Sequence, residues 1–121
     1  MKDFTKIEPE LRLYQDEYFF IIKDGFPVSP GHLLIISNEL RQDYFDLSEL
    51  EKLHLPKVIE QAKEIILSES NPEGFNIGMN CGAAAGQTVF HFHCHLIPRF
   101  HGDMENPRGG VRHVIPSKGN Y

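Results

Sequence analysis

Three histidines occupy alternate positions in the stretch GQTVFHFHCHLIPR: His91, His93 and His95. Successive side chains of a strand point to opposite faces, so an extended conformation would place all three imidazoles on one face. The apolar set on the opposite face would then be Phe90, Phe92, Cys94 and Leu96. A rise of about 3.3 Å per residue separates neighbouring histidines by roughly 6 to 7 Å along the strand. One compact ligand would therefore contact all three rings.

Three chemical interpretations of this row are open. A histidine-rich solvent face is the first, although the strict apolar alternation on the other side argues against it. A zinc site is the second, since strand histidines two residues apart and a third ligand can hold zinc. No His-Glu-x-x-His or paired-aspartate motif accompanies the row, so we expect no metal site. We favour the third, nucleophilic catalysis, in which one neutral imidazole attacks phosphorus and its neighbours bind the anionic oxygens.

The residues before the row favour a phosphate ligand. Small residues fill positions 82–86 and let the backbone approach a phosphate closely, and Gln87 and Thr88 follow as uncharged donors. The same segment elsewhere would indicate only a tight loop. Beside three histidines it predicts that the bound group carries phosphate.

Composition limits the class of protein. The chain has 121 residues, with 12 Lys and Arg against 17 Asp and Glu, a formal charge of −5. This balance argues against a nucleic-acid partner, while an acidic surface still allows a locally positive pocket. Two cysteines, no signal-peptide pattern and no apolar run of roughly 20 residues predict a cytoplasmic protein without a membrane segment.

Extended segments dominate both halves of the sequence. Residues 18–37 contain two strands rich in aromatic and β-branched residues, separated by turn residues, and predict an antiparallel pair. A weak strand is expected over 11–14 and a clear one over 75–80. The histidine row is expected on a strand that begins at residue 87 and stops before Pro98.

One helical segment separates these groups of strands. Apolar residues recur three or four apart over 46–70, which is typical of an amphipathic helix. Ser48 and Glu51 match a capping box that favours a start there. Pro56 lies too deep for the first turn, so a kink or a break is expected near residues 54–55.

These elements predict an α+β fold. An antiparallel sheet of about five strands would pack against the single long, Pro-interrupted helical segment. The length suits one domain over 1–121, in which 100–121 form a Gly-, Pro- and Arg-rich C-terminal tail.

The stretch GQTVFHFHCHLIPR resembles the signature of the histidine triad family, in which three histidines alternate with apolar residues after Gly-Gln-Ser/Thr. KDGFPVSPGHLLIIS is similar to the family's strand pair, so the likeness covers most of 18–99. The tail GDMENPRGGVRHVIPSKGNY resembles stand-alone bacterial members described as dinucleoside polyphosphate hydrolases.

The resemblance implies catalytic roles for four histidines. His93 would attack the α-phosphorus of a nucleotide and form a covalent nucleotidyl-histidine. Such a nucleophile must be neutral, with its other ring nitrogen donating to a carbonyl. His95 would bind the α-phosphoryl oxygens. His91 would orient the row, with a contact to His32, which matches the family's fourth histidine.

Further side chains are expected to bind the nucleotide. The donors expected near the α-phosphate are Asn80, Gln87 and Thr88. Asp24 would accept from both ribose hydroxyls, a role compatible with initiating the turn that follows it. Ile22 and Leu34 share a face by alternation and would form apolar walls for the purine.

The tail offers Arg108 and Arg112 around two glycines. Arginine pairs well with phosphate oxygens, so these residues are expected to bind the leaving polyphosphate or a second nucleotide. Packing against a partner subunit, with solvated arginines, is the open alternative. The resemblance also implies a homodimer. No cofactor is expected, although a divalent cation can accompany a polyphosphate substrate.

The expected function is therefore a nucleotidyl hydrolase or transferase. It would cleave dinucleoside polyphosphates such as diadenosine tetraphosphate, or related adenylylated compounds, at the α-phosphate. The alternative is a purine-nucleotide-binding regulatory module with incidental phosphoramidase activity. The leaving group, the acceptor and the preferred base stay open.

Overall fold

The computed structural model describes residues 3–121, which form a five-stranded antiparallel sheet with one long helix. In sheet order, the strands are β1 (Tyr14–Gln15), β2 (Phe19–Lys23), β3 (Leu33–Ser37), β5 (His93–Arg99) and β4 (Gly74–Gly78). The helix α1 spans Glu49–Leu67. The short 3-10 helices are η1 (Phe4–Lys6), η2 (Pro9–Leu11), η3 (Tyr44–Asp46), η4 (Ala83–Ala85), η5 (Gly110–Val114) and η6 (Pro116–Lys118). The predicted α+β fold is confirmed.

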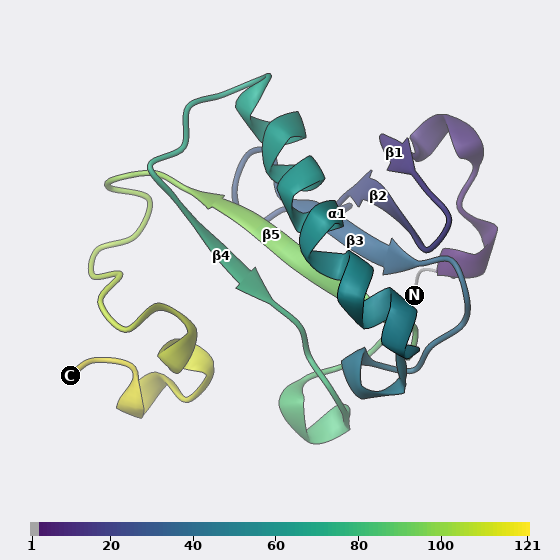
Figure 1. Ribbon diagram of the computed structural model, residues 1–121. Coiled ribbons are helices and arrows are strands. Elements are labelled where there is room, and N and C mark those ends of the chain that lie inside the picture. Colours follow the sequence, from purple (N-terminus) through teal and green to yellow (C-terminus); the bar gives the residue numbers. More distant parts are fainter. Residues whose placement is uncertain (1–2) are drawn as a thin grey trace.

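Both faces of the sheet are covered at its centre. The helix crosses one face diagonally (Figure 1). Phe19, Ile21 and Cys94 are buried beneath it, while Phe20 and Ile22 pack on the other face against the N-terminal segment. Burial on both sides explains why β2 and β3 are almost continuously apolar instead of alternating. The second face is the one that carries the candidate site.

The helix begins where the sequence predicts but does not break at Pro56. The Ser48 hydroxyl accepts from the Glu51 N–H, and the Glu51 carboxylate accepts from the Ser48 N–H, which completes the capping box. Pro56 lies inside one continuous helix, so the expected break is wrong. The proline is exposed. Water can therefore satisfy the carbonyl that loses its helical partner there, which limits the cost of an interior proline.

The strand that carries the histidines is shorter than predicted at its start and longer at its end. β5 begins at His93, so His91 precedes the strand, and it continues through Pro98 to Arg99. Leu33, the first residue of β3, pairs with Leu96. Pro98 therefore lies beyond β3 and faces only β4, a position at which a missing N–H is tolerated.

Within residues 3–121, no helix combines the length and the hydrophobicity that crossing a lipid bilayer requires.

Candidate active site

The histidine row lies on the sheet face opposite α1. His93 pairs with Ile36 and His95 with Leu34, and residues paired across antiparallel strands share a face. Phe92, Cys94 and Leu96 point to the helix side, as predicted. Phe90 is exposed instead of packing in the core, because the chain is not yet in a strand there.

His91 is a buried anchor at the start of the row. Its side chain is 3% exposed, and its Nε2 donates to the Ser37 carbonyl at 2.7 Å. The expected contact between His91 and His32 is wrong, because this hydrogen bond directs the His91 ring toward the end of β3 instead.

His93 has the hydrogen-bonding pattern of a neutral nucleophile. Its Nδ1 lies 2.8 Å from the His91 carbonyl oxygen and must donate to it, since a carbonyl only accepts. In a neutral ring this leaves the lone pair on Nε2. The ring lines a cavity of about 370 Å³, the nucleotide cavity, together with Asp24, Leu34 and His95.

A chain of hydrogen bonds fixes the tautomer of His95. The Val28 N–H donates to Nδ1 of His32, so a neutral His32 carries its proton on Nε2. That nitrogen lies 2.9 Å from Nδ1 of His95 and 3.3 Å from Oδ2 of Asp24. When His95 accepts at Nδ1, its own Nε2 carries a proton. This proton is available to a phosphate oxygen in the cavity.

Burial keeps this pair of histidines uncharged. Burial lowers the pKa of His95 to about 4, helped by the neighbouring His93 and His32 rings and opposed by Asp24. Burial also lowers the pKa of His32, against the influence of Asp24. At neutral pH both rings therefore have the protonation that the hydrogen bonds require.

Asp24, His32 and His95 also offer ligand-type atoms within 4.8 Å of one another. A metal would need a lone pair on Nε2 of His32. The Val28 N–H already occupies the Nδ1 lone pair, so Nε2 carries the proton and has no lone pair to give. The observed hydrogen bonds therefore favour a chain of donors and acceptors from Val28 through His32 to His95 over a metal centre.

The predicted ribose and base residues lie together in the cavity region. Asp24 lines the cavity, and its Oδ1 also accepts from the Phe26 N–H at 2.8 Å, so the turn and the cavity share one carboxylate. Leu34 lines the cavity, and Ile22 is buried beside it in the same cluster. The binding roles of these residues remain predictions.

Two aromatic residues of the cavity had no sequence signal. Phe4 from η1 meets the His93 ring edge-on, with ring centroids 5.2 Å apart, and Phe26 lines the cavity with 92% of its surface exposed. Phe4 is 89 residues from His93 in the sequence, and no spacing rule connects the two. Phe26 lies two residues after Asp24 in a turn, and nothing in the sequence indicated that its side chain would line the cavity.

The predicted phosphate donors divide between two neighbouring sites. Thr88 lines the nucleotide cavity, while Asn80 lines an adjoining cavity that shares His95. Arg108 and Arg112 stack on Tyr121, and Arg112 donates to carbonyls of the tail itself. Neither arginine lines these cavities.

The buried side chain of Gln87 has a structural role, because it forms hydrogen bonds to three backbone segments. The side chain is 4% exposed, its Oε1 accepts from the Gly82 N–H, and its Nε2 donates to the Gln42 and Val89 carbonyls. With both ends of the amide occupied, the predicted donation to phosphate is replaced by a positioning role. Gln87 holds the loop before the histidine row against the segment after β3.

Replacement of Gln87 by leucine is expected to lower the free energy of unfolding by about 2 kcal/mol, because buried partners lose their hydrogen bonds. Urea unfolding measures this change. Thr88→Val, an exposed neighbour, serves as the control and should unfold like the wild type. Equal stability of Gln87→Leu and wild type would contradict this structural role of Gln87.

Comparison with known proteins identifies the family. Residues 5–102 match the family model described as HIT domain. The chain therefore belongs to the HIT family.

Several proteins are similar to this chain in sequence or in structure. An "AP-4-A phosphorylase" from Mycobacterium tuberculosis is 32% identical over 106 residues, which cover 83% of this chain and 54% of that protein. A HIT family protein from Bacillus anthracis superposes with a TM-score of 0.71 at 41% identity, covering 76% of this chain and 65% of that one. A HIT family hydrolase from Clostridium thermocellum gives 0.65 at 34% identity, covering 78% and 83%. The chain spans about half the length of the mycobacterial relative.

Proposed function

We propose that the protein is a nucleotidyl hydrolase or transferase that acts at the α-phosphate of dinucleoside polyphosphates such as diadenosine tetraphosphate. The observation that carries this proposal is the hydrogen bond from His93 Nδ1 to the His91 carbonyl, which leaves the Nε2 lone pair beside a cavity of nucleotide size. Membership of the HIT family and the name of the mycobacterial relative support it.

In the first step, the His93 Nε2 lone pair forms a bond to the α-phosphorus as the bond to the bridging oxygen breaks. The bridging oxygen leaves with the bonding electron pair as part of the polyphosphate. The Nε2–H of His95 donates to a non-bridging oxygen, where charge collects in transfer.

In the second step, an acceptor oxygen attacks the same phosphorus and the N–P bond breaks, which returns the lone pair to His93. Water as the acceptor yields AMP and releases its proton. Inorganic phosphate as the acceptor yields ADP. Two displacements of this kind replace one harder direct displacement.

The test is to detect the covalent intermediate and to identify the acceptor. Wild-type protein is mixed with diadenosine tetraphosphate, quenched in alkali because phosphoramidate bonds are labile in acid, digested and analysed by mass spectrometry. We expect an adenylyl mass on the peptide that contains His93, and AMP as the product in water. Added phosphate shifts the product to ADP if the reaction is phosphorolytic.

A regulatory nucleotide-binding module is the second candidate function, since the same cavity would bind AMP without any chemistry. Saturable AMP binding by calorimetry, with neither adduct nor product from diadenosine tetraphosphate, would select it over the enzyme. An adduct on a residue other than His93 would reject the assigned nucleophile.

A homodimer, a single domain over 1–121 and a reaction without a cofactor remain predictions. β4 is the last strand of the sheet and pairs only with β5 among the described residues, which is compatible with pairing to a second copy. Light scattering after gel filtration would give the mass in solution.

A further inference from the structure

The face that carries the histidines continues past the nucleotide cavity along β5. Ile97 and Arg99 follow His95 at every second residue and therefore share its face. A middle cavity of about 320 Å³ is lined by His95, Asn80 and Ile97, among others. A far cavity of about 330 Å³ is lined by Ile97 and Arg99. Shared lining residues connect the three cavities in sequence.

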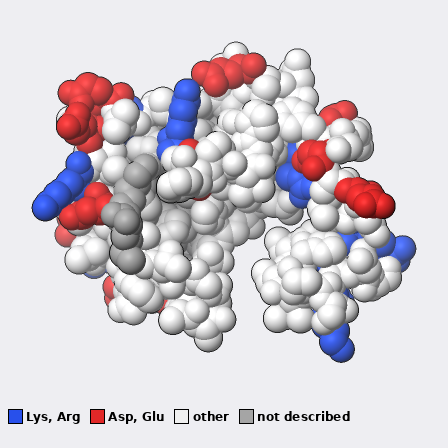
Figure 2. Space-filling model, turned by 180° about the vertical axis from the view of Figure 1, so that it is seen from behind, with Lys and Arg blue, Asp and Glu red and all other residues white. Residues whose placement is uncertain are grey.

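The C-terminal tail forms the outer wall of the middle and far cavities. Gly110 of η5 lines both of them and approaches β4 closely, since a Cβ placed on it would lie 3.5 Å from the Asn76 Nδ2. Seen from behind, the surface is hollowed between the tail and the rest of the molecule (Figure 2). The residues that line the middle and far cavities include no Lys or Arg of the tail.

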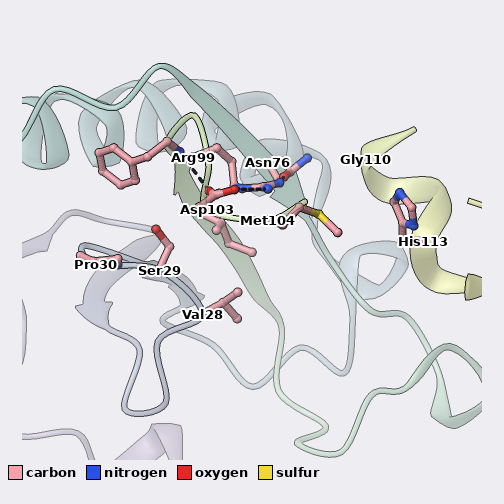
Figure 3. A pocket seen from close by; sticks show the side chains of 11 residues that line it. Val28, Ser29, Pro30, Asn76, Arg99, Asp103, Met104, Gly110 and His113 are labelled. Atoms are coloured by element: carbon pink, nitrogen blue, oxygen red, sulfur yellow. Dashed lines mark hydrogen bonds and ion pairs between the residues drawn. The ribbon is translucent and has the colours of Figure 1, made fainter. Parts of the chain in front are cut away.

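The charged groups of the far cavity neutralise each other. Arg99 donates twice to the Asp103 carboxylate, at 2.8 and 2.7 Å, and once to Oδ1 of Asn76 at 2.6 Å (Figure 3). These three guanidinium N–H groups are therefore already hydrogen-bonded and are not available to a phosphate. A polyphosphate would find no free positive charge there, so the far cavity suits an uncharged group.

One buried polar group in the far cavity has no partner. Ser29 is 7% exposed, and its hydroxyl makes no hydrogen bond. Figure 3 shows its side chain extending from the loop toward the strand that carries Arg99. A buried hydroxyl without a hydrogen-bond partner carries a cost in stability. A ligand that offers it a hydrogen bond would recover part of that cost, and apolar Val28, Ile97 and Met104 would contact the rest of an uncharged ring.

We propose that the middle and far cavities together bind the leaving half of the substrate, with its phosphates over the middle cavity and a second nucleoside in the far cavity. This inference rests on the proposed function. The four residue-to-residue steps from His95 to Arg99 span about 13 Å along the strand. A polyphosphate linker is therefore needed to reach from the reacting phosphorus to Ser29.

A fluorescent reporter tests occupancy of the far cavity directly. The chain contains no tryptophan, and Met104 lines the far cavity while remaining partly exposed. Met104→Trp therefore introduces a single indole there. In a His93→Ala background, which removes the nucleophile, diadenosine tetraphosphate should change the fluorescence emission of the indole, whereas AMP and ATP should not. Equal emission changes with all three ligands would overturn the proposal.

Kinetics provide a second measurement that does not depend on the reporter. Ser29→Val should lower kcat/KM for diadenosine tetraphosphate at least fivefold more than it lowers kcat/KM for an adenosine phosphoramidate of a small amine. The small amine leaves beside the histidine row and does not reach the far cavity. Ser117→Val, the same change at an exposed tail position, is the matched control and should affect neither substrate. Equal losses on both substrates in Ser29→Val would contradict a leaving-group site.

The two proposals fail in different ways. If AMP does not bind by calorimetry and no substrate is turned over with dependence on His93, the proposed function is wrong. If AMP binds and the phosphoramidate is cleaved, but the indole does not respond to diadenosine tetraphosphate, only the leaving-group site is wrong.

Discussion

Replacement of His93 by alanine is expected to lower kcat/KM for diadenosine tetraphosphate by at least about 10⁴-fold, a loss of the size seen when a covalent nucleophile is removed. The His93 ring supplies the only bond to phosphorus in the proposed first step. Its removal should leave AMP binding in place, because the cavity walls come from other elements such as η1, β3 and the loop that contains Asp24.

The fold of His93→Ala is expected to survive. The ring is partly exposed, and its hydrogen bond to the His91 carbonyl does not connect two distant elements. Thermal unfolding checks this, and His101→Ala, whose ring is largely solvent-exposed, is the control for activity. A His93→Ala protein that retained a tenth of wild-type turnover would rule out the nucleophile, provided that calorimetry shows normal AMP binding.

Local patterns in the sequence were sufficient to predict the main elements. The alternation at Phe92 and Cys94 placed these side chains on the helix side, and the Ser48–Glu51 capping box marked the start of α1. Each of these features depends on residues within a few positions of one another, so the sequence alone contains the information.

Features that depend on tertiary context were not predictable in the same way. Pro56 is accommodated because its side of the helix faces solvent, which the helical period alone did not decide. His32 contacts His95 and not His91, because β3 and β5 run antiparallel in a register that brings Leu34 opposite His95. Register between strands 60 residues apart has no local signal.

The assignment of Gln87 shows the same limit within the candidate site. A Gly-Gln-Thr segment beside histidines suggested donors for phosphate. In the structure, the side-chain amide of Gln87 instead forms hydrogen bonds with the backbone of Gly82, Gln42 and Val89. One of these partners is 45 residues away. A buried amide binds the backbone when nearby backbone N–H and C=O groups have no other hydrogen-bond partner. Which groups these are depends on the tertiary structure.

The second large effect concerns acid stability. Lowering the pH from 7 to 4.5 is expected to reduce the free energy of unfolding by about 2.5 kcal/mol through His95 alone. The pKa of His95 is lowered to about 4 in the fold, against an ordinary value of 6.5. The unfolded chain therefore binds a proton over this range and the folded one does not. Stability from this group is complete above pH 6.5 and is lost as the pH falls toward 4.

Urea unfolding of wild type and His95→Gln at pH 7 and pH 4.5 isolates this contribution, because glutamine offers an N–H and an accepting oxygen without titrating. Other groups also weaken the fold in acid, so the measured quantity is the difference between the two proteins. The loss on acidification should be about 2.5 kcal/mol smaller in His95→Gln than in wild type, while His101→Gln should behave as wild type. Equal acid losses in wild type and His95→Gln would show that His95 is not held neutral, and the hydrogen-bond chain from Val28 through His32 would then not fix its proton.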